Sequence, residues 1–501
     1  MYNISNLNKE LIMSLPDWVL PFKEPRTEIK RIKGTYYKYA VSYRYNPEKK
    51  RTDKITGHLL GKITREAGFV PSDKNSIRKQ SEQAGVSVKT YGLYHLFDNL
   101  LSPEIASLKK TFGDEEAEKL LSFSMMRWAH QSPIKRAPDY HAHDYCSQHW
   151  CKGALTAKRI SQSLKFFGQN REAVVEWMRG ILDKSPEAET GFVMIDSTHT
   201  PSSSEKLAIN AKGYNPSFDF GKQIRLMYMF SSHLKQPVYY RPINGNIPDV
   251  SSMSLCVKEF KAKNVVFVAD KGFFSEDNVK MLDTQQLQYI IPLRRNNAMI
   301  DLSPSQEPGF KKNIKNHFMY QNRAIWYWQY ERNGRQLITF LDDYLRVNEE
   351  NDYLQRITTK PEEFTQEGFV EKLPTFGTLT IVHKTKKALC PNEIYETYKL
   401  RNEIEIMFDS YKNYLDADVT YMQDRYVLDG WLFANFIAMT AYCKLFARLK
   451  QANLIHKYSP KDIVEISKAI FMIKNGNQWL LSETSAKTRA IFNKINIDYL
   501  T

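Results

Sequence analysis

Apolar and polar residues alternate near the N-terminus of this chain, and the pattern changes to a helical period further on. Residues 35–63 begin with the partly alternating run TYYKYAVSYRY and continue through EKKRTDKITGHLLGKIT. This pattern predicts a strand, a basic turn and a second strand. Over residues 86–181, apolar residues recur at steps of three and four, as in DEEAEKLLSFSMMRWAHQ, which predicts a small helical domain.

A different pattern starts at residue 191. Three short apolar runs, GFVMI, VVFVA and YIIPL, are typical of buried strands, and helical patterns separate the second run from its neighbours. Residues 223–240 read as a β-hairpin around SSHLKQP, and Ser275 is placed to cap the helix that follows the second run. Strands that alternate with helices predict a mixed α/β sheet covered by helices.

The helical alternation stops over residues 294–383. NRAIWYWQYERNGRQLITFL predicts a hairpin that turns at Asn333 and Gly334, and FGTLTIVHK predicts a further strand. After Pro391 the chain is helical through Leu415, and again over 428–450. We therefore predict six segments: a basic β region (1–85), a helical region (86–185), the first part of an α/β core (186–295), a β-rich insertion (296–385), the second part of the core (386–455) and a helical tail (456–501).

The charge of the chain points to a polyanionic partner. Its 501 residues contain 71 Lys and Arg against 56 Asp and Glu, a formal net charge of +15, and the first 80 residues alone carry +9. Nucleic acid is the first candidate for such a partner, and an anionic membrane surface is the second. With 42% hydrophobic residues, a disordered chain is excluded.

The remaining composition indicates a soluble protein of a reducing compartment. Five scattered cysteines do not form a disulfide framework, and the N-terminus has no secretory signal pattern, so we expect a cytoplasmic location. The most apolar long window, residues 427–449, contains Asp429, Lys444 and Arg448, which favours a buried helix over a membrane span.

One short stretch is rich in residues that bind metals. HAHDYCSQHWC supplies His141, His143, Cys146, His149 and Cys151. The spacing lacks the Cys-x-x-Cys pairs of common zinc modules, so ordinary packing is the favoured interpretation, with zinc as the alternative.

Two of the predicted strands end in a carboxylate, Asp196 and Asp270. If these strands are neighbours, both acids lie at one edge of the sheet, where a divalent cation would relieve their repulsion. Ligands that are all oxygen suit Mg²⁺. Turn and helix-capping roles are the alternative, because aspartates at strand ends are common.

The segment PNEIYETYKLRNEIEIMFDSYKNYL adds a third group of candidate residues. At about 100° per residue, Arg401, Glu405 and Lys412 fall within about 60° of Tyr398 on one helical face. Glu405 could complete a metal site while Arg401 and Lys412 hold phosphates, with Asp409 as a rival to Glu405. The alternative is a salt-bridged surface helix, since Arg401 and Glu405 are spaced as an i,i+4 ion pair.

These residues resemble a known family. The spacing of Tyr398, Arg401, Glu405 and Lys412 is similar to the Tyr-Arg-Glu-Lys signature of bacterial insertion-sequence DDE transposases of the insertion-sequence-four type. MIDST and FVADKGFFSEDN resemble the blocks that carry the first and second Asp, and INGNIPD resembles the turn between them. The N-terminal hairpin that ends near HLLGKI is similar to the start of the long members, which have a β-strand insertion before the final Glu.

The resemblance implies a fold, a site and an activity. The fold is an α/β, ribonuclease-H-like core interrupted by a β-rich insertion, with DNA contacts in the first two segments. Asp196, Asp270 and Glu405 would hold two Mg²⁺ ions, for which Mn²⁺ could substitute. Tyr398, Arg401 and Lys412 would contact DNA. Lys271 follows Asp270 where many relatives have Arg, and keeps the charge without the bidentate fork.

The implied activity is DNA transposition. Such an enzyme would bind the terminal inverted repeats of its element as double-stranded DNA, cleave at the element ends and join the 3′-hydroxyl ends to target DNA. A homodimer is expected, because two ends are processed together, in the bacterial cytoplasm near the nucleoid and with no membrane partner. A metal-dependent nuclease without strand transfer and an inactive DNA-binding protein remain the alternatives.

Overall fold

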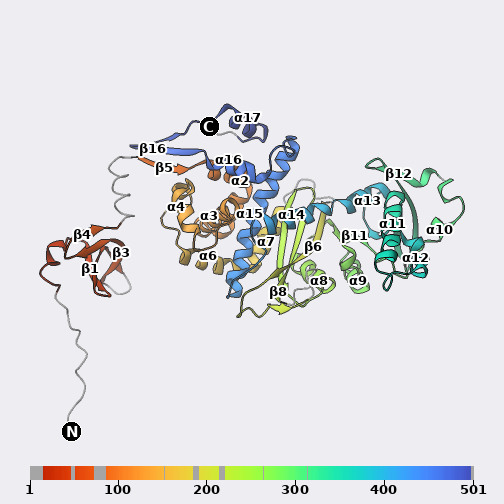
Figure 1. Cartoon of the computed structure of the whole chain (residues 1–501), viewed down its shortest axis with the longest axis horizontal. Helices are drawn as coiled ribbons and strands as arrows, with labels where there is room; N and C mark the ends of the chain where they lie inside the picture. Colours follow the sequence, from red (N-terminus) through yellow and green to blue (C-terminus); the bar gives the residue numbers. More distant parts are fainter. Residues whose placement is uncertain are drawn as a thin grey trace, which may run out of the picture. The chain divides into compact units, whose positions relative to one another are not determined.

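The computed structural model describes residues 15–46, 51–72, 86–151, 153–183, 191–213, 221–262, 264–312 and 314–497. The chain forms two compact units, which Figure 1 colours along the sequence. One unit contains Met1–Lys89 and Met472–Ser482, and the other contains Thr90–Phe471 and Glu483–Thr501.

The first unit contains two small sheets. The four strands of the antiparallel sheet, in chain and spatial order, are β1 (Thr27–Ile32), β2 (Thr35–Asn46), β3 (Arg51–Thr64) and β4 (Gly68–Pro71). Val19, just before the short helix η1 (Leu20–Phe22), is fully buried with Tyr36 and Ile63 on one face of this sheet. The predicted pair of strands is thus confirmed as β2 and β3, while the basic turn, 47–50, lies outside the described residues. The second sheet has the order β17 (Gln478–Leu481), β16 (Phe471–Asn475) and β5 (Val86–Thr90).

Helices follow the short strand β5 (Val86–Thr90), as the periodicity predicts. They are α2 (Gly92–Phe112), α3 (Asp114–His130), α4 (Ala137–His143), α5 (Cys146–His149), α6 (Ala157–Gln169) and α7 (Arg171–Asp183). Local chemistry sets their ends: the Thr156 hydroxyl accepts from the backbone N–H of Arg159 to cap α6.

A mixed sheet runs through the second unit. Its ten described strands are β6 (Gly191–Pro201), β7 (Ala211–Lys212), β8 (Lys222–Ser231), β9 (Gln236–Asn244), β10 (Val265–Ala269), β11 (Gln288–Pro292), β12 (His317–Tyr320), β13 (Arg323–Arg332), β14 (Arg335–Asp342) and β15 (Thr378–Lys384). The spatial order is β12-β13-β14-β15-β11-β10-β6-β8-β7, and β9 also pairs with β8.

The predicted buried strands lie at the centre of this sheet. β6, β8 and β9 form an antiparallel meander, β10 pairs parallel with β6, and β11 pairs parallel with β10. β10 and β11 are buried along their whole length, because parallel strands at the centre of a sheet are covered on both faces. The mixed α/β core is therefore confirmed.

Helices cover both faces of the central strands. Neighbouring residues of a strand point to opposite faces. Tyr239 of β9 packs against Phe260 of α8 (Asp249–Phe260), with ring centroids 4.9 Å apart. Tyr240 packs against Phe436 of α15 (Arg425–Gln451), at 5.7 Å. The next helix along the chain, α9 (Glu276–Thr284), is capped by Ser275, as predicted.

The insertion departs from its prediction in two ways. Its strands are part of the central sheet, since β15 pairs antiparallel with β11 and covers that strand's free edge. It also contains two helices that the sequence pattern did not predict, α11 (Asp343–Thr359) and α12 (Gln366–Lys372), besides the single turn α10 (Ser303–Gln306). Only Tyr353 is buried in α11, so that helix lacks an apolar stripe. The hairpin turn at Asn333 and Gly334 is confirmed.

The last third of the chain supplies the core helix. Most of α15 is buried, as expected for residues 427–449. Among the described residues it is the one helix long and apolar enough to cross a membrane, but 72% of its apolar window is buried inside the protein. Burial in the core thus explains why α15 is apolar.

The C-terminal tail, expected to be helical, is mixed. Between α16 (Pro460–Lys468) and α17 (Ala486–Lys494) lies a hairpin of β16 (Phe471–Asn475) and β17 (Gln478–Leu481). Its turn contains Gly476 at φ +61°, a conformation that glycine adopts without strain. The alternating run FMIKN is too short to separate strand from helix by period alone.

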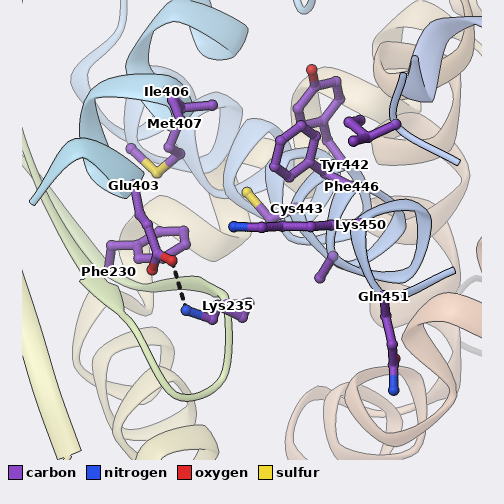
Figure 2. Close-up of a pocket in the computed structure, with 12 residues that line it drawn as sticks. Phe230, Lys235, Glu403, Ile406, Met407, Tyr442, Cys443, Phe446, Lys450 and Gln451 are labelled. Carbon is purple, nitrogen blue, oxygen red and sulfur yellow. Dashed lines mark hydrogen bonds and ion pairs between the residues drawn. The ribbon is translucent and has the colours of Figure 1, made fainter. Parts of the chain in front are cut away.

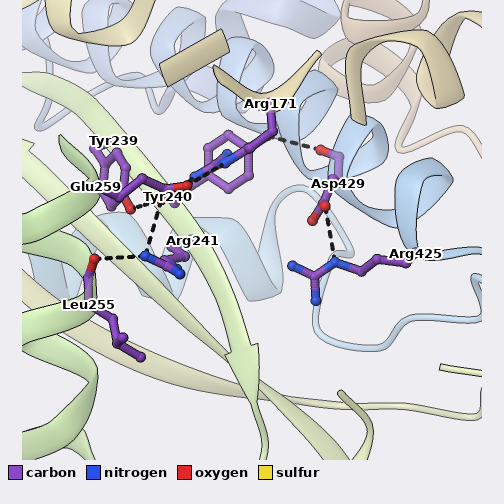
Figure 3. A network of polar contacts seen from close by, with 8 residues as sticks. All are labelled: Arg171, Tyr239, Tyr240, Arg241, Leu255, Glu259, Arg425 and Asp429. Atoms are coloured by element: carbon purple, nitrogen blue, oxygen red, sulfur yellow. Dashed lines mark hydrogen bonds and ion pairs between the residues drawn. The ribbon is translucent and has the colours of Figure 1, made fainter. Parts of the chain in front are cut away.

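A buried polar network ties α7 to the sheet and to α8 (Figure 3). Arg171 donates to the Tyr240 carbonyl at 2.5 Å and pairs with Glu259 at 3.2 Å. Its guanidinium also lies 4.7 Å from the centroid of the Tyr240 ring. Glu259 in turn accepts from the Tyr239 hydroxyl and pairs with Arg241 at 3.5 Å. Each buried charge is thus matched by an opposite charge or a hydrogen bond.

Candidate active site

Two carboxylates lie side by side at one edge of the central sheet. Ile195 of β6 and Ala269 of β10 are partners in a parallel register. The next residues along the two strands are Asp196 and Asp270. Neighbouring strands are about 4.8 Å apart, so both side chains share one region of the sheet edge. The two strands are neighbours, so the condition set for a shared site is met.

The third group comes from a helical segment with a break. One continuous helix was predicted, but α13 (Pro391–Lys399) and α14 (Asn402–Asn413) are separated by a turn at Leu400 and Arg401. The N–H of Arg401 donates to the carbonyl of Tyr398, and the N–H of Ile404 to that of Arg401, both bonds being i to i−3. The tighter turn at this point replaces the ordinary helical ladder.

Arg401 connects the helical segment to the sheet. Its Nη1 lies 3.5 Å from Oδ2 of Asp196, and its Nη2 lies 2.6 Å from Oε1 of Glu405. The side chains of Arg401 and Asp196 are only 18% and 19% exposed, whereas that of Glu405 is 49% exposed. The i,i+4 ion pair weighed as an alternative is therefore present, but it is also part of a contact that reaches Asp196. The rival acid Asp409 accepts from Asn413.

Burial dominates the electrostatics of Asp196. Loss of solvent raises the pKa of its carboxyl to about 7, and the nearby Asp270 and Asp249 charges act in the same direction. The Ser197 N–H and the Arg401 guanidinium oppose this shift. Because the pKa of this carboxyl is near neutrality, a further nearby cation would favour its ionised form.

Burial and neighbouring charges also shift the pKa values of Arg401 and Tyr398. Burial lowers the pKa of Arg401, but the negative groups around it, of which Asp270 has the largest effect, raise that pKa overall. Burial likewise raises the pKa of the Tyr398 phenol, which lies 6.0 Å by ring centroid from the Arg401 guanidinium carbon. Four of the predicted residues therefore interact electrostatically around Arg401, which is the centre of the arrangement.

An open, basic cavity adjoins Asp270. It has a volume of about 740 Å³, and its lining includes Asp270, Lys271, Tyr398 and Arg401. Lys271 begins the short helix η2 (Lys271–Phe273). Arg294 and Arg295, which follow β11, also line the cavity. The sequence analysis missed this pair, although two consecutive arginines after a predicted strand were a visible signal.

Lys412 of α14 is close enough to His199 of β6 for its charge to act on that ring. Burial lowers the pKa of His199, and the charges of Lys412 and Arg225 lower it further. His199 is three residues beyond Asp196 on β6 and pairs with Arg225 of β8. The predicted helical face is thus spread over the sheet edge, with Arg401 at one end and Lys412 at the other.

A protein-family model described as the transposase DDE domain matches residues 187–440. The match includes both aspartates, the insertion and the helical segment with Glu405, and it spans 254 of the 501 residues. The chain belongs to this family. The resemblance that the sequence motifs suggested is confirmed at this level, and the chain is a DDE transposase.

Three solved transposase structures are similar to parts of the chain. A piggyBac transposase synaptic complex with hairpin DNA is 11% identical in sequence and has a TM-score of 0.38. The match covers 75% of this chain and 79% of the piggyBac chain. A Mos1 strand transfer complex is 13% identical over 49% of this chain and 71% of its own, with a TM-score of 0.15. A pre-cleavage Mos1 transpososome is 9% identical over 54% and 75%, also at 0.15. The search of curated proteins found no match.

The donor chemistry of this DDE transposase suits a hard divalent cation. Asp196, Asp270 and Glu405 offer only carboxylate oxygens. Over the described ranges, no three His, Cys, Asp or Glu side chains are gathered as metal ligands. The Arg401 guanidinium instead spans Asp196 and Glu405. The acids thus lie around one positive charge, and their oxygen-only donor set fits a divalent cation.

A further acid near Asp196 was not singled out from the sequence. Asp249, the last residue of INGNIPD and the first of α8, accepts from the Ser197 hydroxyl and pairs with Arg225. Asp249 is the first residue of α8 and lies close to Asp196, whose pKa its charge helps to raise. The turn motif was visible in the sequence, but its contact with Arg225 of β8 depends on strand pairing.

The stretch His141–Cys151 shows no metal site in the part of the chain that the structure describes. His149 stacks on Tyr94, with ring centroids 5.2 Å apart and planes 12° apart. Cys146 and Cys151 are buried. His149, Cys146 and Cys151 thus take part in ordinary packing.

A second cavity lies on the other side of α14 (Figure 2). It measures about 500 Å³, and Met407, Tyr442 and Phe446 are among its mostly apolar lining residues. Lys235 and Glu403 form an ion pair of 2.6 Å at this cavity. Glu403 precedes Glu405 by two helical positions and points away from it, so this cavity is separate from the two aspartates.

Proposed function

We propose that this protein is the transposase of an insertion sequence of the insertion-sequence-four type. It binds the terminal inverted repeats of its element, cleaves the DNA at the element ends and joins the 3′-hydroxyl ends to target DNA. The observation that carries this proposal is the registered pair Asp196 and Asp270, linked through Arg401 to Glu405. The family match to residues 187–440 supports the reaction class.

In this proposal Asp196, Asp270 and Glu405 hold two Mg²⁺ ions, with Mn²⁺ as a substitute. When bound, such ions activate a water or a 3′-hydroxyl and stabilise the leaving oxygen. The chain's own contribution is to bring the carboxylates of β6 and β10 together and to desolvate Asp196. Arg401, whose planar fork suits bidentate contact, would bind a phosphate oxygen of the DNA.

The basic lining of the open cavity supports a role in holding DNA. Lys271, Arg294 and Arg295 face the same space as Asp270 and Tyr398. Cations beside a scissile phosphate position it by charge, and the Tyr398 phenol, whose pKa is raised by burial, stays protonated and can donate a hydrogen bond. Lys412 would contact the DNA farther along β6.

We assign the five strands β6, β8, β9, β10 and β11 to a ribonuclease-H-like core. The antiparallel meander followed by two parallel strands supports this assignment. A homodimer on paired element ends and a location in the bacterial cytoplasm, at the nucleoid, complete the proposal. The homodimer follows from the need to process two ends together, and the location from the free, scattered cysteines.

The test is a plasmid assay with the full chain. A plasmid carrying the DNA ends that flank the gene is incubated with Mg²⁺, and both strand cleavage and joining to a target plasmid are measured. The D270N variant should lose both products by at least about 10³-fold, whereas D277N, which removes an exposed carboxylate of α9, should retain them. Cleavage without joining would indicate a nuclease, and full activity of D270N would refute the assigned site.

A further inference from the structure

The sheet of β1 to β4 has one closed face and one open face. The closed face carries Tyr36 and Ile63, which are buried with Val19. Residues of β2 alternate between the faces, so Tyr37, Tyr39, Tyr43 and Tyr45 point to the open side. Lys30 of β1 lies 5.7 Å from the centroid of the Tyr39 ring on that side. The open face is therefore aromatic and basic.

The β2–β3 hairpin extends beyond its neighbouring strands. Residues 41–46 of β2 pair with residues 51–56 of β3. The pairing of β1 with β2 ends at Ala40, and β4 pairs only with the last four residues of β3, Gly61–Thr64. Apart from Val41, whose N–H donates to the Arg26 carbonyl at 2.8 Å, this part of the described chain is thus a two-stranded ribbon with no third strand paired to either edge. Tyr43 and Tyr45 on it are each 61% exposed.

Positive charge is present on both faces of this ribbon. Tyr43 is the cross-strand partner of Lys54, so Lys54 shares the face of the tyrosines. Arg44 is the partner of Asp53, and Arg51 donates to Asp53 at 3.1 Å, which places both arginines on the opposite face. Lys54 is held 3.0 Å from Glu28 of β1, at the base of the ribbon.

We infer that this β2–β3 ribbon inserts into the major groove of duplex DNA. The major groove is about 12 Å wide and admits a two-stranded ribbon. Six residue pairs at about 3.4 Å each extend about 20 Å, which is long enough to cross the groove. Cations on both faces match the two phosphate backbones that line a groove. Arginine and exposed tyrosine supply donors for base edges and phosphates.

The distribution of charge on the ribbon favours duplex DNA over single-stranded DNA as its ligand. A platform for single strands gathers its cations and aromatic rings along one groove, because one backbone has to be followed. The ribbon instead places Arg44 and Arg51 opposite Lys54. The inference rests on the proposed function only in taking DNA as the partner, and it adds the element and the groove that are used.

The first test measures binding by the full chain, without Mg²⁺ so that no cleavage occurs. The probes are a fluorescent 30-base-pair duplex of mixed sequence and the corresponding 30-nucleotide single strand, each titrated over a range of KCl. The R44Q/K54Q variant should bind the duplex about tenfold more weakly than the wild type. Its slope of log Kd against log salt should fall by about 2, since each phosphate contact contributes about 0.9.

The matched control removes a cation at the opposite end of the same sheet. Lys33 lies in the β1–β2 turn, so K33Q should change neither the affinity nor the slope by a comparable amount. Equal circular dichroism spectra establish that the variants are folded. Wild-type affinity in R44Q/K54Q, or tighter binding of the single strand than of the duplex, would overturn the inference.

A second test identifies the groove. Methyl green occupies the major groove and netropsin the minor groove, so competition by each dye is measured with the wild-type protein on the same duplex. Methyl green should displace the protein, and netropsin should have a much smaller effect. The opposite order would refute insertion into the major groove while leaving the cleavage activity intact. Loss of cleavage together with normal ribbon-dependent binding would refute the proposed function alone.

Discussion

The Asp196 carboxyl provides a direct test of the electrostatics at the sheet edge. Burial raises its pKa from 3.8 to about 7. A carboxyl group whose pKa is higher in the folded state binds a proton more tightly there, so it stabilises the fold at low pH. This contribution is lost as the pH rises from the unfolded value through the folded one. The wild-type protein should therefore lose stability between pH 5 and pH 8 in the absence of divalent ions.

The size of the loss in unfolding free energy follows from the pKa shift of Asp196. Between pH 5 and a folded pKa of about 7 lie about two pH units, each worth about 1.36 kcal/mol, so the loss is about 3 kcal/mol. The D196N variant lacks the titrating group. The difference in unfolding free energy between D196N and wild type should therefore rise by about 3 kcal/mol from pH 5 to pH 8.

The assay is urea unfolding of both proteins at several pH values, followed by tryptophan fluorescence in EDTA. D277N serves as the control for removal of one negative charge, because Asp277 is exposed on α9. Addition of Mg²⁺ at pH 8 should then stabilise the wild type and leave D196N unchanged, since a bound cation offsets the cost of ionising Asp196. A difference between D196N and wild type that stays constant within about 0.5 kcal/mol across this pH range would refute the reasoning.

Three further predictions concern other parts of the molecule. R401Q removes a charge that lowers the pKa of Asp196, so the midpoint of the stability loss should move to higher pH in the same urea experiment. R171M leaves the partly buried Glu259 without its main cation and should lower the unfolding free energy by about 2 kcal/mol, measured at pH 7, whereas the double variant R171M/E259Q should recover part of it. G430A places a Cβ 1.9 Å from a carbonyl oxygen of α6 and should cost about 3 kcal/mol in thermal unfolding; an unchanged melting temperature would show that these helices do not pack as closely as described.

The central strands were predictable because their signal is local. VVFVA and YIIPL are short apolar runs, and each forms a buried strand. GFVMI forms the start of β6, but that strand continues through Asp196 to Pro201 instead of ending at the acid as predicted. The position of an acid directly after two of them followed from the sequence, and their parallel register brings Asp196 and Asp270 together. Local pattern and global pairing agree here, as expected for the centre of a fold.

The parts that were missed depend on long-range contacts. The pairing of β11 with β15 joins the insertion to the core sheet across about ninety residues, and no local pattern encodes it. Helix α11 has one buried residue, so its period is not visible. The bridging position of Arg401 depends on a tight turn within a sequence that reads as one helix. Its spacing predicted the pair with Glu405 but not the contact with Asp196.

The most direct test of the central claim is anomalous diffraction from crystals soaked in Mn²⁺. We predict at least one anomalous peak within about 2.3 Å of carboxylate oxygens from both Asp196 and Asp270, with Arg401 moved away from Asp196. Crystals of the D196N variant should lack that peak under the same conditions. Wild-type crystals with no peak at these residues, and with Arg401 still between Asp196 and Glu405, would contradict the account.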